Sequence, residues 1–378
     1  MAVRIERLAW TDISFGEIAL PKKAMKLTLG LGSGLSRRPG DAPGRVFAIT
    51  DRGPNIFAST AIDDYGLTGL ERFRKTEAKF MPLPALGPEI VELQVEGATV
   101  RLIQRLPLRT QTGHRLSGMP LLAADPESEE AEHVLGLDGE PLDDDRTMQL
   151  GADAEAIAAM PDGSFFVAEE YGPSLLRVNS DGVVAARWVV AAPEDALGNS
   201  DLPALGLLPP AAAMRRPNRG LESLCVSADG AWLYLGMQSA LANDDEMFVP
   251  IWKLSVTTGE LTAEWRYPFD APSTFKRDAA RRKVTARDLK ICEFAWAGDD
   301  KLIVLERIAH TSKLYLTDLA RLPEKRLLLS TDDHPEIGPD IEGMTLLSPS
   351  EILIASDNDF GVEDAQTEFW RITLDAPL

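Results

Sequence analysis

Acidic residues recur at matching positions in four similar stretches of this sequence. Each stretch begins with a glutamate, continues through a short apolar segment to a polar or glycine-containing turn, and ends in a second apolar segment. The four glutamates are Glu155, Glu222, Glu293 and Glu342. The second segments are rich in β-branched and aromatic residues, which is typical of strands on either side of a short turn. The sequence therefore predicts four related β-hairpins, each with a carboxylate at its start.

Further polar residues follow the same pattern. Asp153 and Asp340 each lie two residues before one of these glutamates, so in an extended strand their side chains point to the same side. The ends of the second segments add Asp51, Glu170, Glu306 and Asp357, with Asn55, Gln238 and Asn358 nearby.

Carboxylates gathered at one point raise one another's pKa values or bind a cation. A set of six to eight oxygen ligands in flexible geometry is typical of Ca²⁺. We therefore predict a Ca²⁺ site, whereas the four histidines and two cysteines lack the spacing of zinc ligands. The predicted ligands are Asp51, Asp153, Glu155, Glu222, Glu293, Glu342 and Asp357.

Arginines accompany these acids, as Arg52 in DRGPN, Arg219 in NRGLES and Arg307 in LERIA. Arginine forks beside a metal suit an anionic group such as phosphate. The alternative is a structural ring in which each arginine neutralises its neighbouring acid. The sequence favours neither interpretation over the other.

The hairpins must belong to larger repeated units. A fifth related stretch, LGSGLSRRPGDAPGRVFAITDRGPN, lies upstream, and residues 89–108, 250–269 and 312–330 supply further hairpins after three of the five. Repeated four-stranded units with radial closure predict an all-β fold, a β-propeller. We expect one domain over residues 1–378 with five blades, or six if residues 56–150 contain another.

The N-terminal residues 3–10 and 14–21 are left over, and we expect both to complete the last, strand-poor repeat and so close the ring. Because the first strand of each blade lines the channel of a propeller, the recurring carboxylates should meet at one mouth. Helix is expected only at residues 128–136 and 273–290, and the acidic stretches 125–133 and 143–146 are interpreted as solvated loops.

The composition limits the classes of partner. A net charge of −20 over 378 residues argues against nucleic acid or an anionic membrane, which attract clustered Lys and Arg. No apolar run approaches the roughly 20 residues that cross a bilayer. The first residues lack the apolar stretch of a secretory signal, which leaves the location open, and the oligomeric state is open as well. Cys225 and Cys292 lie in apolar segments and are expected to be buried thiols.

Taken together, the motifs DRGPN, DAEAIAAMPDGSFFVAEEYGP, NRGLESLCVSADG, FAWAGDDKLIVLERIA and LIASDNDFG resemble the phytase-like family, the domain described as esterase-like activity of phytase. The resemblance extends from about Leu31 to Phe360. It implies a β-propeller and hydrolysis of a phosphoester or ester, often in secreted or periplasmic bacterial proteins. Two departures are Ala156 and Ser223, where the family has glycine after the glutamate, and a third is Ile308, where it has an acid. The motif residues that correspond are Asp51, Arg52, Asn55, Glu155, Glu170, Arg219, Glu222, Glu306, Arg307, Glu342, Asp357 and Asn358.

These observations predict a metal-dependent hydrolase for a small-molecule ester or phosphoester. Ca²⁺ would polarise the phosphoryl or acyl oxygen, Arg52, Arg219 or Arg307 would hold the anion, and Glu170 or Glu306 would act as general base. The sequence has no Gly-x-Ser-x-Gly motif, so no serine nucleophile is indicated. The alternatives are a Ca²⁺-dependent lactonase and a non-catalytic binding propeller whose channel ion is structural.

Overall fold

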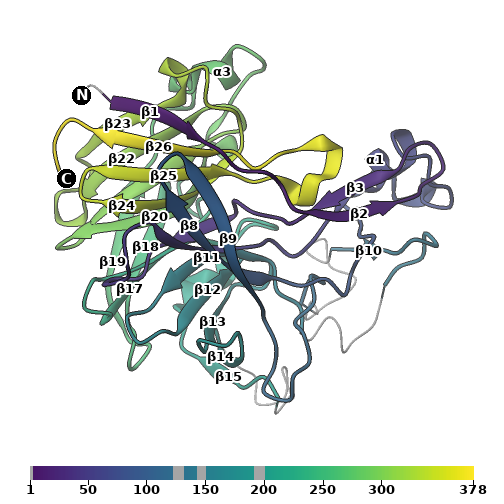
Figure 1. The fold of residues 1–378 in the computed structure, drawn as a ribbon, viewed down its shortest axis with the longest axis horizontal. Coiled ribbons are helices and arrows are strands. Elements are labelled where there is room, and N and C mark those ends of the chain that lie inside the picture. Colours follow the sequence, from purple (N-terminus) through teal and green to yellow (C-terminus); the bar gives the residue numbers. More distant parts are fainter. Residues whose placement is uncertain (1–2, 122–131, 143–149, 191–200) are drawn as a thin grey trace.

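The computed structural model describes residues 3–121, 132–142, 150–190 and 201–378. The described secondary structure is mainly β-strand, and nearly all of the strands pair in antiparallel sheets (Figure 1). The predicted acidic loop at 143–146 lies outside the described residues, and so does most of the one at 125–133.

Five sheets of four or five strands make up the body of the described chain, and within each sheet the strands lie side by side in chain order, with the N-terminal strand added at the edge of the fifth. The first contains β4 (Gly34–Ser36), β5 (Arg45–Ile49), β8 (Glu89–Glu96) and β9 (Thr99–Pro107). The second contains β11 (Ala154–Ala159), β12 (Phe165–Glu169), β13 (Ser174–Val178), β14 (Val184–Val189) and β15 (Ala204–Gly206). The third contains β16 (Leu221–Val226), β17 (Trp232–Met237), β18 (Phe248–Ser255) and β19 (Leu261–Pro268). The fourth contains β20 (Lys290–Gly298), β21 (Lys301–Arg307), β22 (Ser312–Asp318) and β23 (Lys325–Ser330), and the fifth contains β24 (Ile341–Ser348), β25 (Glu351–Ser356), β26 (Phe369–Leu374) and β1 (Val3–Leu8).

The first strands of these sheets form a closed ring. β4 contacts β11, β11 contacts β16, β16 contacts β20, β20 contacts β24, and β24 contacts β4 again. The fifth sheet combines both ends of the chain, because β1 pairs with β26 from Val3 opposite Leu374 to Leu8 opposite Phe369. Closure by the N-terminal strand leaves no gap between the first and the last unit. The predicted fold class, a β-propeller, is confirmed.

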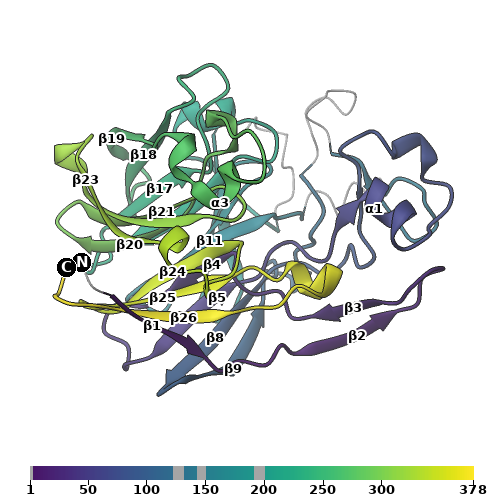
Figure 2. The same cartoon turned by 90° about the horizontal axis from the view of Figure 1, so that it is seen from above.

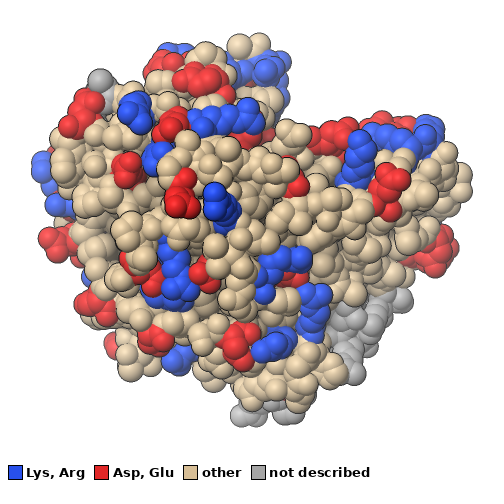
Figure 3. All heavy atoms as spheres, viewed as in Figure 1, with Lys and Arg blue, Asp and Glu red and all other residues tan. Residues whose placement is uncertain are grey.

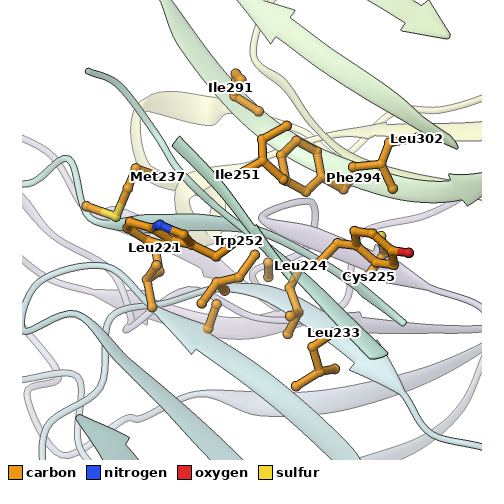
Figure 4. Close-up of a cluster of buried hydrophobic side chains, with 14 of the residues drawn as sticks. Leu221, Leu224, Cys225, Leu233, Met237, Ile251, Trp252, Ile291, Phe294 and Leu302 are labelled. Carbon is orange, nitrogen blue, oxygen red and sulfur yellow. The ribbon is translucent and has the colours of Figure 1, made fainter. Parts of the chain in front are cut away.

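The sheets are held together by apolar side chains on their facing surfaces. Figure 4 shows one such cluster, in which Leu224, Trp252 and Phe294 pack between the third and fourth sheets. Burial of one such side chain stabilises the fold by about 1.5–3 kcal/mol. This packing fixes the first strands around the axis and so determines where their polar residues meet.

A small lobe projects from one side of the ring (Figures 1 and 2). It contains the hairpin of β2 (Ser14–Ile18) and β3 (Met25–Thr28), a sheet of β6 (Ile56–Phe57), β7 (Lys79–Phe80) and β10 (Val134–Leu135), and the helix α1 (Ala58–Asp63). The expectation that residues 14–21 join the last sheet is wrong, because β1 alone occupies the free edge of β26 and β3 packs in the lobe through Met25 and Leu27.

Helix is confined to short segments in the described chain. The predicted helix at 273–290 is broken into η3 (Pro272–Thr274), α3 (Lys276–Ala279) and η4 (Ala286–Asp288), and the described end of the one predicted at 128–136 contains β10 instead. Other single turns are η1 (Glu71–Phe73), η2 (Pro210–Met214), η5 (Leu319–Arg321), η6 (Thr331–Asp333) and η7 (Asp359–Asp364). No helix among the described residues is long and apolar enough to span a bilayer. On the face drawn in Figure 3, acidic and basic side chains are interspersed.

Candidate functional site

A polar cavity of about 160 Å³ lies where the first strands of the sheets begin. Ten residues singled out in the sequence line it, together with four that were not. The predicted ones are Asp51, Arg52, Asn55, Asp153, Glu155, Glu170, Glu222, Gln238, Glu342 and Asp357, and the others are Lys79, Asn218, Lys290 and Asp359. Eight of these side chains are carboxylates and three are cationic, so the cavity is acidic with basic residues on its wall.

A β-bulge turns each of three glutamates into this cavity. In β16, Leu221 pairs with Met237 and Ser223 with the adjacent Gly236, so that Glu222 between them has no partner in the ladder. Glu155 in β11 and Glu342 in β24 occupy the same bulged position. Because a bulge adds one residue and re-aims its side chain, the three carboxylates are directed to one point.

The fourth sheet has the same bulge, but its residue is Cys292. Ile291 pairs with Glu306 and Glu293 pairs with Leu305, which leaves Cys292 as the extra residue. Glu293 therefore does not line the cavity, contrary to its predicted place among the metal ligands. Its buried carboxylate accepts hydrogen bonds from the backbone N–H groups of Leu35 (3.0 Å), Phe294 (3.0 Å) and Leu224 (3.5 Å). Burial raises the pKa of Glu293 well above its usual range.

The same offset affects Glu306. Glu306 pairs with Ile291, just before the bulge, and the residue in this position of the second sheet is Glu169, which pairs with Ala154. The counterpart of Glu170 is therefore the next residue, Arg307, and not Glu306. A shift of one residue places a strand side chain on the opposite face. Glu306 accordingly lies away from the cavity, where it accepts a hydrogen bond from the hydroxyl of Tyr267 (2.6 Å) and pairs with Lys325. This position is inconsistent with its predicted role as general base in the cavity.

Four buried oxygen atoms of the cavity have no hydrogen-bond partner among the described residues. They are Asp153 Oδ2, Glu170 Oε1, Glu222 Oε2 and Gln238 Oε1. A buried acceptor without a donor costs about 1–3 kcal/mol, and more when it is charged. A cation among these atoms would supply the missing interactions.

The carboxylates of the cavity also raise one another's pKa values. Burial, and next to it the charge of Asp153, raises the pKa of Asp51 well above the usual range. Burial and Asp51 do the same for Glu155, and burial and Glu222 for Glu170. Burial and the neighbouring Asp359 raise the pKa of Asp357 to about 7. The groups therefore repel one another when ionised without a compensating cation.

Three groups of donor atoms among the described residues are close enough to share an ion, with all ligand atoms of a group within 4.8 Å of one another. They are Asp51, Asp153 and Glu155; Glu155, Glu170 and Glu222; and Glu222, Cys292 and Glu342. The first two contain only carboxylate oxygens, the donors that Ca²⁺ prefers. The third is less suitable for Ca²⁺, because one of its donors is the sulfur of Cys292, whose pKa burial raises to about 12.

The cationic residues are unevenly placed around the cavity. Arg52 lies 3.4 Å from Asp153 and forms a two-pronged pair with Glu132. Arg307 is not on the wall but binds Glu342 and lies 2.9 Å from Asp340, behind the lining. Arg219 is also behind the wall, and burial lowers its pKa in spite of the nearby charges of Glu170 and Glu222.

Lys79 and Lys290 line the cavity although the sequence did not single them out. Burial lowers the pKa of both, with Arg52 adding to the effect at Lys79 and Arg307 at Lys290. Lys290 lies two residues before the bulged Cys292, as Asp153 lies two before Glu155, so a correct alignment of the repeats would have found it. Lys79 comes from the lobe and has no such signal.

Asn358 is close to the cavity but has a structural role. Its side chain accepts hydrogen bonds from the N–H groups of Leu31 and Phe360 and donates to Leu29 O and Thr28 Oγ1. The residue joins the segment after β3 to η7 and is saturated with partners. The residues singled out in the sequence that are absent from the cavity wall are thus Glu293, Glu306, Asp340, Arg219, Arg307 and Asn358.

Comparison with solved structures gives low similarities that concern the fold alone. The PQQ-bound aldose sugar dehydrogenase of Streptomyces coelicolor is 10% identical, with 98% of each chain covered and a TM-score of 0.37. Virginiamycin B lyase of Staphylococcus aureus is also 10% identical, with 99% of each chain covered and a TM-score of 0.36. Hydrazine synthase of Kuenenia stuttgartiensis is 8% identical with a TM-score of 0.34, and the match covers 92% of this chain but 59% of that one.

No curated protein matches the sequence. A family model does match, and it is described as phytase-like, esterase-like activity of phytase. The match extends over residues 28–360, which includes all five first strands and every residue of the cavity. The chain therefore belongs to the phytase-like family.

Proposed function

We propose that this protein is a Ca²⁺-dependent hydrolase of a phosphoester or a related ester, and that the reaction takes place in the acidic cavity. The observation that carries this proposal is the set of four unpartnered buried oxygens, on Asp153, Glu170, Glu222 and Gln238. Oxygens without donors in a cavity with eight carboxylates are expected where a hard cation binds.

The proposed ligands are the carboxylates of Asp51, Asp153 and Glu155, whose donor atoms lie within 4.8 Å of one another, together with Glu222, which shares the second carboxylate group with Glu155. A bound Ca²⁺ would act as a Lewis acid on a phosphoryl or acyl oxygen of the substrate. Arg52 would hold Asp153 in place, because its Nε lies 3.4 Å from Oδ1 of that carboxylate.

Glu170 is the proposed general base. One of its oxygens is buried without a partner, and burial with the nearby Glu222 raises its pKa well above that of an ordinary glutamate. Its carboxylate would therefore accept a proton from the attacking water more readily than an exposed glutamate would. Lys290, on the wall beside Glu222, would hold the negative charge of the substrate.

The cavity limits the size and charge of the substrate. A volume of about 160 Å³ is below the range of about 300–1,000 Å³ for sites that enclose drug-sized ligands. The cavity would therefore take the reacting group, with the rest of the substrate outside. Because the walls have an excess of carboxylates over cationic groups, a singly charged phosphoester, a carboxylic ester or a lactone fits better than a densely anionic molecule.

The test is hydrolysis by the purified protein of 4-nitrophenyl phosphate, 4-nitrophenyl acetate and a simple lactone, each with excess Ca²⁺ and with a chelator. Turnover that disappears with the chelator is expected for at least one substrate. Glu170→Gln should lower that turnover by about 10²–10⁴-fold, the range for loss of a general base.

Glu169→Gln is the matched control, since Glu169 is an adjacent buried glutamate that does not line the cavity, and its carboxylate accepts hydrogen bonds from Ser174 (2.9 Å), Gly172 (3.0 Å) and the backbone N–H of Asp153 (3.4 Å). Its turnover per folded molecule should stay within a few-fold of the original. Absence of turnover on all three substrates, with Ca²⁺ still raising the melting temperature, would instead mean a binding propeller with a structural ion.

A further inference from the structure

A second cavity lies in the ring, and its lining differs from that of the acidic cavity. It has a volume of about 410 Å³ and is formed by the ends of the first strands, while the acidic cavity is formed by their beginnings. On β16, for example, Glu222 faces the acidic cavity, whereas Leu224 and Val226 line the second one. The two cavities therefore lie at opposite ends of the channel.

The buried carboxyl group of Glu293 separates the two cavities. Its oxygens bind the N–H groups of Leu35, Leu224 and Phe294, each of which lines the second cavity and each of which is on a different first strand. The channel is thus closed at this level by a side chain with three hydrogen-bond partners. A molecule in the second cavity would not reach the acidic one.

The walls of the second cavity are mainly apolar. They include Leu224, Val226, Phe294, Trp296 and Leu346, and Figure 4 shows Leu224 and Phe294 in the packed region between β16 and β20. The volume lies within the range of about 300–1,000 Å³ in which proteins bind small organic molecules. An apolar body would gain by leaving water for this space.

One charged group on the wall has no oppositely charged partner in the described part of the chain. The guanidinium of Arg37 donates from Nη2 to the carbonyl oxygen of Asp41 (3.0 Å), but its Nε is buried without a partner and it forms no ion pair with a described residue. In a chain with a net charge of −20, a half-buried arginine without a carboxylate is an available anchor for an anion.

The neighbouring Arg38 shows the contrast. Its Nε and Nη2 donate to the carbonyl oxygens of Met160 (2.8 Å) and Gly163 (3.1 Å), and Nη1 lies 3.6 Å from Asp41. The guanidinium also stacks over Phe47 and Phe165. Arg38 therefore fastens the loop after β4 to the second sheet, and Arg37 is left to face the cavity.

We propose that the second cavity binds a small amphipathic anion, with its apolar body between Leu224, Phe294 and Leu346 and its carboxylate or similar group on Arg37. This site is separate from the proposed hydrolase site and does not depend on it.

The experiment uses 8-anilinonaphthalene-1-sulfonate, an aromatic anion that fluoresces in apolar surroundings, with decanoate and 1-decanol as competitors. We expect saturable binding of one probe per chain, displaced by decanoate at lower concentration than by 1-decanol, and unchanged by a calcium chelator. Arg37→Met keeps the apolar stem and removes the charge, so it should weaken decanoate binding about tenfold or more and leave competition by 1-decanol unchanged.

Arg101→Met is the matched control, because Arg101 is an exposed arginine on β9 away from the cavity. It should bind both competitors like the original protein. Ala297→Trp, which places a large side chain on the cavity wall, should abolish binding of both. The proposal is overturned if no saturable binding occurs, if Arg37→Met behaves like Arg101→Met, or if Ala297→Trp folds and still binds both competitors.

Discussion

Replacement of Glu222 by glutamine tests the cation site directly, because Glu222 belongs to two of the three groups of potential ligands. Ca²⁺ at a hundred times its dissociation constant stabilises a protein by about 2.7 kcal/mol. For 378 residues, the entropy of unfolding is about 0.8 kcal/mol/K, so this stabilisation corresponds to a rise of about 3 °C in melting temperature.

A hundredfold loss of affinity in Glu222→Gln would reduce that increment to below about 1 °C at the same Ca²⁺ concentration. In the presence of a chelator, Glu222→Gln should melt at the same temperature as the original protein or higher, because the substitution removes a charge that repels Glu155 and Glu170. Thermal melts followed by circular dichroism, with Ca²⁺ and with chelator, measure both quantities.

Glu306→Gln is the control, since Glu306 is as buried as Glu222 but pairs with Lys325 outside the cavity. Breaking a buried ion pair costs about 3–5 kcal/mol, which should lower the melting temperature by about 4–6 °C with or without Ca²⁺. The increment due to Ca²⁺ should remain at about 3 °C. The reasoning is refuted if Glu222→Gln keeps the full increment, or if Glu306→Gln loses it.

The cavity and its surroundings lead to three further predictions. The pKa of Asp357 is raised to about 7, so the folded metal-free protein holds this proton more tightly than the unfolded chain does. The metal-free protein therefore loses stability as the pH rises from about 4 through 7. Over the same range the carboxyl group becomes ionised, and Ca²⁺ competes with fewer protons. The melting-temperature increment due to Ca²⁺ should therefore grow between pH 5 and pH 8, and an increment independent of pH would contradict this. Asn358→Ala leaves the buried partners of that side chain unsatisfied and should cost about 2–4 kcal/mol in urea unfolding, with the Ca²⁺ increment preserved. Gly220→Ala would place a Cβ 1.9 Å from the carbonyl oxygen of Glu170. The backbone at Glu170 would have to shift, so both turnover and melting temperature should fall. Normal turnover in the folded variant would contradict the position assigned to Glu170.

The propeller could be predicted because its hairpins are visible as local patterns. Alternating apolar segments around turns such as Asp162-Gly163 and Thr258-Gly259 identify antiparallel pairs without knowledge of the rest of the chain. Residues 14–18 show where local pattern is insufficient. They do form a strand, but the choice between β26 and β3 as its partner depends on which edge is already taken by β1.

The errors in the site have a different cause, which is the bulge. Glu293 and Glu306 were matched to Glu155 and Glu170 by residue type, whereas the backbone pairing matches Cys292 and Arg307 to them. A bulge inserts one residue without a sequence signature of its own, and an error of one residue exchanges the two faces of a strand. Lys79 was missed for another reason, since it reaches the cavity from the lobe and not from a repeat.

The register at the bulges also explains why charge is distributed unevenly around the cavity. In the second and third sheets the bulged residues are glutamates, and Glu170 and Gln238 follow the second strands, so this side offers mainly carboxylate and amide oxygens. In the fourth sheet the corresponding positions are the thiol of Cys292 and Arg307, which lies behind the wall, and Lys290 lines the cavity two residues before Cys292. A cation would therefore be stabilised on the side of the second sheet, and negative charge near Lys290 on the side of the fourth. In an ester bound between the two sides, the cation would attract the carbonyl or phosphoryl oxygen, and the basic side would attract the anionic part of the molecule. The substrate would thus bind in one orientation, which a symmetrical ring of carboxylates could not impose.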